Sequence, residues 1–150
     1  MMTPRSSLVL RSRLESLQRL EGFICKVMQR NRLDEDMRGN VMISTLEAVT
    51  NAIRHGNGIG SDKEVYVQVI ERPTELTIVV RDQGEGFSPE EVDDPTDPEL
   101  LLREGGRGVF LIQALTDECG FEDEGRTVRM TFVCDRCAEV QAPVAEMAEA

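Results

Sequence analysis

The stretch EAVTNAIRHG, residues 47–56, mixes polar and apolar side chains at the interval of an α-helix. Glu47, Asn51 and His55 follow one another four positions apart, so on a helix they share one face. The alanines, valine and isoleucine between them predict a neighbouring face that packs on a core. We predict a helix that carries a polar stripe beside its buried side. It should end at Gly56-Asn57-Gly58, because glycine takes the left-handed conformation that closes helices.

The segment before this helix predicts a strand and a first helix. Residues 6–11 are typical of a short strand, and apolar side chains recur at intervals of three and four from Leu14 to Met28. We expect this first helix to end near Asn31. Asp34 should then cap the second helix, since a carboxylate there accepts a hydrogen bond from a free backbone N–H.

Two strands and a long loop follow the second helix. Residues 64–71 alternate apolar and polar side chains, and residues 75–82 continue after Arg72-Pro73-Thr74, which predicts a hairpin turn. Residues 83–108 contain five of the twelve glycines and three of the six prolines. A stretch of this length between regular elements is typical of a functional lid or of disorder.

The rest of the chain predicts a helix over 108–119 and two closing antiparallel strands over 120–124 and 126–134. Because the helices are separate from hairpin-connected strands in this order, we predict an α+β fold. It is a two-layer sandwich whose mixed, mostly antiparallel sheet is covered on one face by helices. We assign residues 1–135 to one domain and expect residues 136–150 to be a disordered tail.

The composition limits the classes of partner. The 150-residue chain has a net charge of −11, whereas a protein that binds nucleic acid needs a basic face for the phosphates. We therefore expect no direct nucleic-acid partner. An acidic surface can attract basic proteins. Alternatively, it serves only to keep the chain soluble. No long apolar run and no signal peptide are present, so we expect no membrane span and a cytoplasmic location.

The four cysteines do not predict a metal site. Cys134 and Cys137 have the spacing of half a zinc site, but no second pair accompanies them, and the only histidine, His55, belongs to the second helix. A structural zinc ion needs four convergent ligands. Cys25 lies in the apolar pattern of the first helix and is expected in the core.

Three short segments together indicate a nucleotide site. They are Glu47-x-x-x-Asn51, then Asp82-Gln83-Gly84-Glu85-Gly86-Phe87 directly after a strand, and Gly105-Gly106-Arg107-Gly108 directly before a helix. Each is a weak signal alone, because short glycine motifs match freely. Together they offer backbone N–H groups for phosphates at residues 106–109, a carboxylate for an exocyclic amine, and an amide oxygen for Mg²⁺. The combination predicts one purine nucleotide site.

These segments resemble the N, G1 and G2 boxes of the Bergerat-fold ATPases, the superfamily of gyrase, heat-shock chaperone, histidine kinase and mismatch-repair ATPases. More narrowly, STLEAVTNAIRHGNG, VVRDQGEGFSPEEV and LLREGGRGVFLIQALTDE resemble the bacterial anti-sigma factor serine kinases, and the resemblance extends over residues 6–133. It implies a protein that binds ATP with Mg²⁺, sequesters a sigma factor and phosphorylates a serine or threonine on an anti-anti-sigma partner of the STAS type. We also expect a homodimer.

The resemblance implies a role for each matching residue. Asn51 would hold Mg²⁺, and Glu47 would be the general base that activates the attacking hydroxyl. Asp82 would bind the adenine amino group. The remaining assignments are Gly84 and Gly86 at the adenine wall, Gly106, Gly108 and Val109 at the phosphates, Arg103 or Arg107 at the terminal phosphate, Thr127 on the strand facing adenine, His55 in the pocket wall, and residues 88–105 as a mobile lid.

Two other functions stay open. One is an ATP-gated binding module that switches partners without transferring phosphate; Glu47 favours the kinase, because a pure binder needs no base beside the magnesium. The other is an orphan histidine-kinase ATPase domain, which the REGGRGVFLI form of the third segment disfavours. Glu47 also fits a solvated helix position and His55 a helix C-terminal cap. Arg107 stands where many relatives have an apolar residue.

Overall fold

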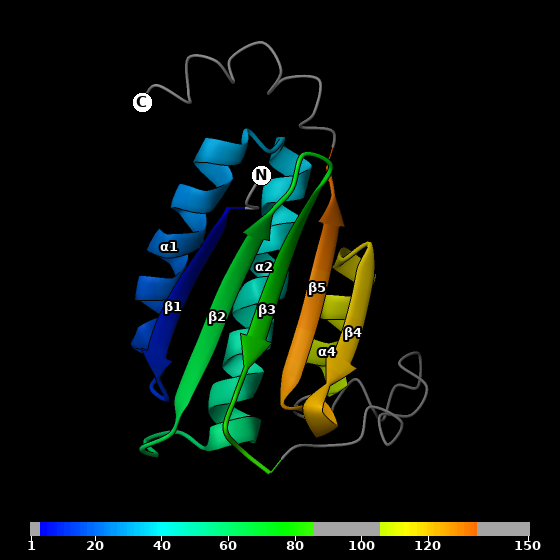
Figure 1. Ribbon diagram of the computed structural model, residues 1–150. Helices are drawn as coiled ribbons and strands as arrows, with labels where there is room; N and C mark the ends of the chain where they lie inside the picture. Colours follow the sequence, from blue (N-terminus) through cyan, green and yellow to red (C-terminus); the bar gives the residue numbers. More distant parts are fainter. Residues whose placement is uncertain (1–3, 86–105, 135–150) are drawn as a thin grey trace.

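The computed structural model describes residues 4–85 and 106–134, with the backbone alone at 106–108. The elements are, in chain order, β1 (Arg5–Arg11), α1 (Ser16–Asn31), α2 (Glu35–Asn51), the π-helical turn η1 (Ala52–Asn57), β2 (Glu64–Glu71), β3 (Glu75–Arg81), α4 (Gly106–Leu115), β4 (Glu118–Glu122), the short 3₁₀ turn η3 (Asp123–Gly125) and β5 (Thr127–Val133). The helices form one layer and the strands the other (Figure 1), which confirms the predicted α+β class.

The strands of the described chain form one sheet in the order β1-β2-β3-β5-β4, and every neighbouring pair is antiparallel. One row of facing residues runs through Leu8, Val67, Val80, Val128 and Phe121. The expectation of a mixed sheet is wrong. The strands β3 and β4 run in the same direction, but β5 lies between them and pairs antiparallel with each. Instead β4 forms the outer edge, and the turn into β5 returns the chain towards the centre (Figure 1).

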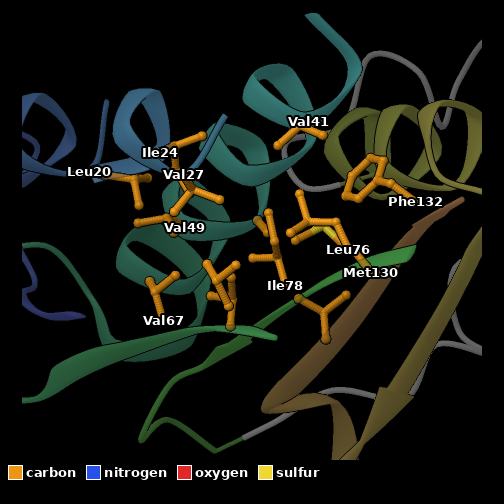
Figure 2. Packing of buried hydrophobic residues seen from close by; sticks show 14 of the residues in the cluster. Leu20, Ile24, Val27, Val41, Val49, Val67, Leu76, Ile78, Met130 and Phe132 are labelled. Carbon is orange, nitrogen blue, oxygen red and sulfur yellow. The ribbon is translucent and has the colours of Figure 1, made fainter. Parts of the chain in front are cut away.

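The hydrophobic core lies between the sheet and the helices α1, α2 and α4, which cover one face (Figure 1). Successive strand residues point to opposite faces, so Val128, Met130 and Phe132 of β5 point inward together. Figure 2 shows Met130 and Phe132 on the side of the sheet that faces the helical side chains, among them Val41 of α2, and all three are buried. Burying a large aliphatic or aromatic side chain in this way stabilises the fold by ~1.5–3 kcal/mol.

Two expectations about the first helices have different outcomes. Asp34 is the N-cap of α2, and its carboxylate accepts a hydrogen bond from the Met37 N–H at 2.8 Å, so the predicted cap is confirmed. The expectation that Cys25 is a core residue is wrong, because Cys25 is exposed. The buried side of α1 consists of Leu20, Ile24, Val27, Met28 and Asn31.

The last helix is shorter than predicted. α4 ends at Leu115, and Cys119, which was expected in the helix, belongs to β4. The reason is a competing set of bonds to the sheet. The Asp117 N–H donates to the Thr131 carbonyl of β5 at 3.0 Å, and the Asp117 carboxylate accepts from the Val133 N–H at 2.7 Å. These bonds turn the chain out of the helix and into the outer strand.

Candidate functional site

The turn η1, which follows Asn51, meets the second predicted segment backbone to backbone at Gly56. A Cβ atom added to Gly84 would overlap the carbonyl group of Gly56, and one added to Gly56 would overlap the Asp82 carboxylate. At Gly84 the obstacle is backbone, so a side chain does not fit there; at Gly56 the obstacle is the Asp82 carboxylate, which would have to move. The glycines are therefore required for close approach, and this contact joins the helix of Glu47 and Asn51 to the loop of Asp82.

The polar stripe predicted from Glu47 to His55 is present at Glu47 and Asn51 but does not extend to His55. Glu47 and Asn51 lie one α-helical turn apart and are both half-buried. From Ala52 the chain winds as a π-helix, whose hydrogen bonds span five residues instead of four, and His55 on this turn is exposed. The change of winding interrupts the four-residue spacing before His55. Within residues 4–85 and 106–134, neither Glu47 nor Asn51 makes a side-chain hydrogen bond or ion pair.

Asn57, which the sequence reading treated only as part of a helix stop, is the residue that fixes this junction. It is buried, and its amide nitrogen donates to the Ser12 hydroxyl at 3.0 Å and to the Glu64 carbonyl at 2.9 Å. Its amide oxygen accepts from the Gln83 N–H at 2.7 Å. One side chain thus ties the end of η1 to the residue after β1, to the start of β2 and to the loop after β3. A Gly-Asn-Gly sequence gives no signal that separates such a residue from an ordinary turn.

Asp82 is half-buried directly after β3, and one of its carboxylate oxygens accepts a hydrogen bond from the Gly84 N–H at 2.8 Å. Burial raises the pKa of Asp82 above its ordinary value, and the nearby carboxylate of Asp123 adds to this. The Gly84 N–H and the positive charges of Arg126 and Lys63 act in the opposite direction. The second carboxylate oxygen has no hydrogen-bond partner in the part of the chain that the structure describes. It is available as an acceptor.

Arg126 also contacts this loop, and the sequence reading did not identify it. Its guanidinium Nε donates to the Gly84 carbonyl at 2.7 Å, and Nη2 donates to the Glu85 carbonyl at 3.1 Å. A third N–H donates to the Asp123 carbonyl at 3.1 Å. In the sequence Arg126 is one of several charged residues beside a strand, so nothing in the local pattern distinguishes it.

Thr127 belongs to the sheet. It begins β5, where it faces Arg81 of β3 and Glu122 of β4, and it is buried. Strand alternation puts it on the sheet face opposite to Val128, which belongs to the core under the helices. This placement gives no support to the predicted contact between Thr127 and adenine.

The third predicted segment begins a helix, as expected. α4 starts at Gly106 and packs against α2, so the backbone of Gly106, Arg107 and Gly108 forms the first turn of a helix beside the one that carries Glu47 (Figure 1). The following Val109 is buried. Free N–H groups at such a start attract anions.

Several predicted residues lie outside the described part of the chain. These are Gly86, Arg103, the predicted lid at 88–105 and Cys137. Cys134 is buried. Among the residues described, no cluster of three or more histidine, cysteine and acidic side chains has the arrangement of a metal site. No helix in this part is long and apolar enough to cross a membrane.

The chain is similar in sequence to serine-protein kinases and similar in fold to a solved structure. Serine-protein kinase RsbW of Staphylococcus aureus, from strain JH9 and equally from strain Newman, is 35% identical over 59% of this chain. The match covers 61% of the RsbW sequence, so it spans about three fifths of these relatives. The crystal structure of the RsbU and RsbW domains of a Mycobacterium tuberculosis protein superimposes with a TM-score of 0.57. That match covers 88% of this chain and 32% of the other, at 14% identity, and shows the fold alone.

A family model supports the same assignment over most of the chain. The model described as "Histidine kinase-like ATPase domain" matches residues 10–132. This range includes α1, α2 and all three predicted segments, together with every strand from β2 to β4 and most of β5. The chain is homologous to the RsbW serine kinases and belongs to the family of histidine kinase-like ATPase domains.

Proposed function

We propose that this protein is an ATP·Mg²⁺-dependent serine/threonine protein kinase and anti-sigma regulatory factor. The observation that carries the proposal is the pair Glu47 and Asn51 on α2. Both are half-buried and without partners in the described chain, and the end of their helix touches the loop that carries Asp82. Half-buried polar groups without protein partners remain open to water and to a ligand.

Adenine recognition is assigned to the loop after β3. One Asp82 oxygen already accepts from the Gly84 N–H, and the other is available to accept from the exocyclic amine of adenine. Gly84 is buried against Gly56, which fixes the position of this loop on the end of α2. We propose that Gly86 forms the adenine wall together with Gly84.

Asn51 fits a magnesium ligand. Mg²⁺ bound to a nucleotide takes few protein ligands, since phosphates and water supply the rest. The Asn51 amide has no bond in the described chain that coordination would have to break. When bound, the ion neutralises phosphate charge. The N–H groups at the start of α4, over residues 106–109, and Arg103 or Arg107 hold the phosphates beside it.

Glu47 is assigned the role of general base. It lies one helical turn before Asn51, so its carboxylate is within the same stripe as the proposed ion. A carboxylate there takes the proton of the attacking hydroxyl, while positioning and charge neutralisation supply most of the catalysis. The relatives are named serine-protein kinases, which supports a serine or threonine acceptor. An ATP-gated module that switches partners without transfer is the alternative.

The partners are proposed from the same relatives. We propose a sigma factor as the sequestered protein and a STAS-type anti-anti-sigma protein as the phosphorylated one, with the kinase acting as a cytoplasmic homodimer. Residues 88–105 are proposed as the lid that orders over the nucleotide. The net charge of −11 is compatible with a partner that carries a basic surface.

Phosphate transfer is the experiment that separates these functions. The chain is incubated with Mg²⁺, ATP labelled on its γ-phosphate, and each STAS-type protein encoded by the same organism. Label on a serine or threonine of one of them is the expected result. Label on a histidine would favour the orphan histidine-kinase function, and ATP-dependent binding without any label would favour the partner-switching module.

A further inference from the structure

Arg126 fastens the turn between β4 and β5 to the loop that begins at Asp82. Its side chain donates to the carbonyls of Gly84 at 2.7 Å and Glu85 at 3.1 Å. Its own backbone carbonyl accepts from the Asp82 N–H at 2.9 Å. Both the side chain and the main chain of one residue thus hold the segment 82–85, from 41 to 44 positions away in the sequence.

The other contacts of Arg126 fix the guanidinium itself. It donates to the Asp123 carbonyl at 3.1 Å and forms ion pairs with the carboxylates of Asp123 at 3.6 Å and Glu124 at 3.4 Å. The side chain is only 27% exposed. A planar guanidinium with several donors in fixed directions holds two successive carbonyls better than a flexible ammonium does. The geometry therefore depends on arginine and not only on a positive charge.

The charge of Arg126 acts on Asp82 as well. The titratable groups that face Asp82 are Arg126, Lys63 and Asp123. Burial raises the pKa of Asp82, and Arg126 is the larger of the two cationic contributions that lower it. Without Arg126, the carboxylate would be protonated at a higher pH than in the wild type.

We propose that Arg126 is a positioning residue for base recognition: it fixes residues 82–85 so that the second oxygen of Asp82 is presented to the exocyclic amine of a purine, and it thereby sets the preference for adenine over 6-oxopurine nucleotides. The inference rests on the proposed function in one respect, the reading of adenine by Asp82. Arg126 does not touch the nucleotide in this account.

The test compares nucleotide affinities in five proteins: wild type, Arg126→Gln, Arg126→Lys, Arg129→Gln and Asp82→Asn. Arg129 is a matched control, since it lies on β5, three residues after Arg126, and pairs with Glu122 at 3.1 Å, without a bond to the loop in the described chain. Dissociation constants for ATP and for ITP, whose base has a 6-oxo group, are measured by titration with Mg²⁺ between pH 4 and pH 8. Circular dichroism establishes that each variant is folded.

Arg126→Gln should lower the affinity for ATP by about 10-fold to 100-fold, the range for a charged hydrogen bond, and leave that for ITP nearly unchanged. The loss of ATP binding on acidification should also occur at a higher pH than in wild type. Arg126→Lys keeps the charge and should recover the pH profile but only part of the preference. Arg129→Gln should match wild type in both readouts.

The outcomes separate the inference from the proposed function. If wild type prefers ATP, Asp82→Asn removes the preference, and folded Arg126→Gln retains it in full, then Arg126 is merely structural and the inference is overturned. If wild type binds neither nucleotide, the proposed function fails and the inference fails with it. Should Arg126→Gln not fold, an Arg126→Lys variant with the same ATP-to-ITP ratio as wild type would overturn the inference as well.

Discussion

The polar side chains near the C-terminal ends of α1 and α2 differ in their hydrogen bonds. At the end of α1, Asn31 donates to the Glu71 carboxylate of β2 at 2.5 Å and to a carbonyl of its own helix, and the same carboxylate accepts from Arg30 Nη2 at 2.8 Å. Near the end of α2, Glu47 and Asn51 have no side-chain partner in the described ranges.

Hydrogen bonding within the protein distinguishes a structural polar group from a candidate ligand-binding group. An asparagine at the end of α1 and one at the end of α2 are the same residue type in similar positions. Asn31 is buried with its donors in use, so it stabilises the contact between α1 and β2. Asn51 contributes no such bond. In the proposed function, its amide binds the ligand instead.

The largest effect is expected for Glu47→Gln. This substitution keeps the size of the side chain but removes the proton acceptor, so phosphate transfer should fall by about 10²–10⁴-fold, the usual range for general base catalysis. ATP affinity and thermal stability should stay close to wild type. The measurement is single-turnover transfer to the identified partner. A variant that transfers phosphate at the wild-type rate would make Glu47 structural, like the polar groups around Glu71.

Gly84→Ala should have the next largest effect, this time on stability. An added methyl group overlaps the Gly56 backbone, and relieving such overpacking costs about 1–3 kcal/mol in the free energy of unfolding. The matched control is Gly39→Ala on α2, where a Cβ meets nothing within 4 Å and should stabilise by about 0.5–1 kcal/mol. Urea unfolding of both variants gives the comparison. Equal stabilities would show that the contact between Gly56 and Gly84 is loose.

The smallest effect is the pH dependence of Asp82→Asn. The folded protein raises the pKa of Asp82 above 3.8, so it favours the protonated form, and ionisation of this carboxyl opposes folding. The cost is absent below pH 3.8 and complete above the raised pKa. The unfolding free energy of Asp82→Asn should therefore rise relative to wild type across this window and then stay constant. A difference that does not change with pH would contradict the burial of this charge.

Local sequence patterns predicted most of the fold. The alternation of residues 64–71 and 75–82 and the cap at Asp34 depend on neighbours in sequence, and the elements formed nearly as expected. The position of β5 between β3 and β4 depends on pairing between distant strands, which alternation does not specify. The antiparallel character of every pair was therefore missed.

The candidate site was predicted less completely for the same reason. The glycines of the second segment mark the close approach at Gly56 and Gly84, although the sequence does not say what approaches them. Asn57 acquires its role from Ser12 and Gln83, which are 45 and 26 positions away. The π-helical turn likewise has no pattern of its own in the sequence, because apolar residues there also fit an α-helix.

Titration of two asparagine variants shows whether the Asn51 amide binds ATP with Mg²⁺. ATP binding with Mg²⁺ and urea unfolding are measured for Asn51→Ala and Asn31→Ala. The account predicts that Asn51→Ala abolishes binding with stability equal to or above wild type, because alanine favours the helix. It predicts that Asn31→Ala binds normally but loses about 1–3 kcal/mol of stability. Unchanged ATP affinity in folded Asn51→Ala would contradict the account.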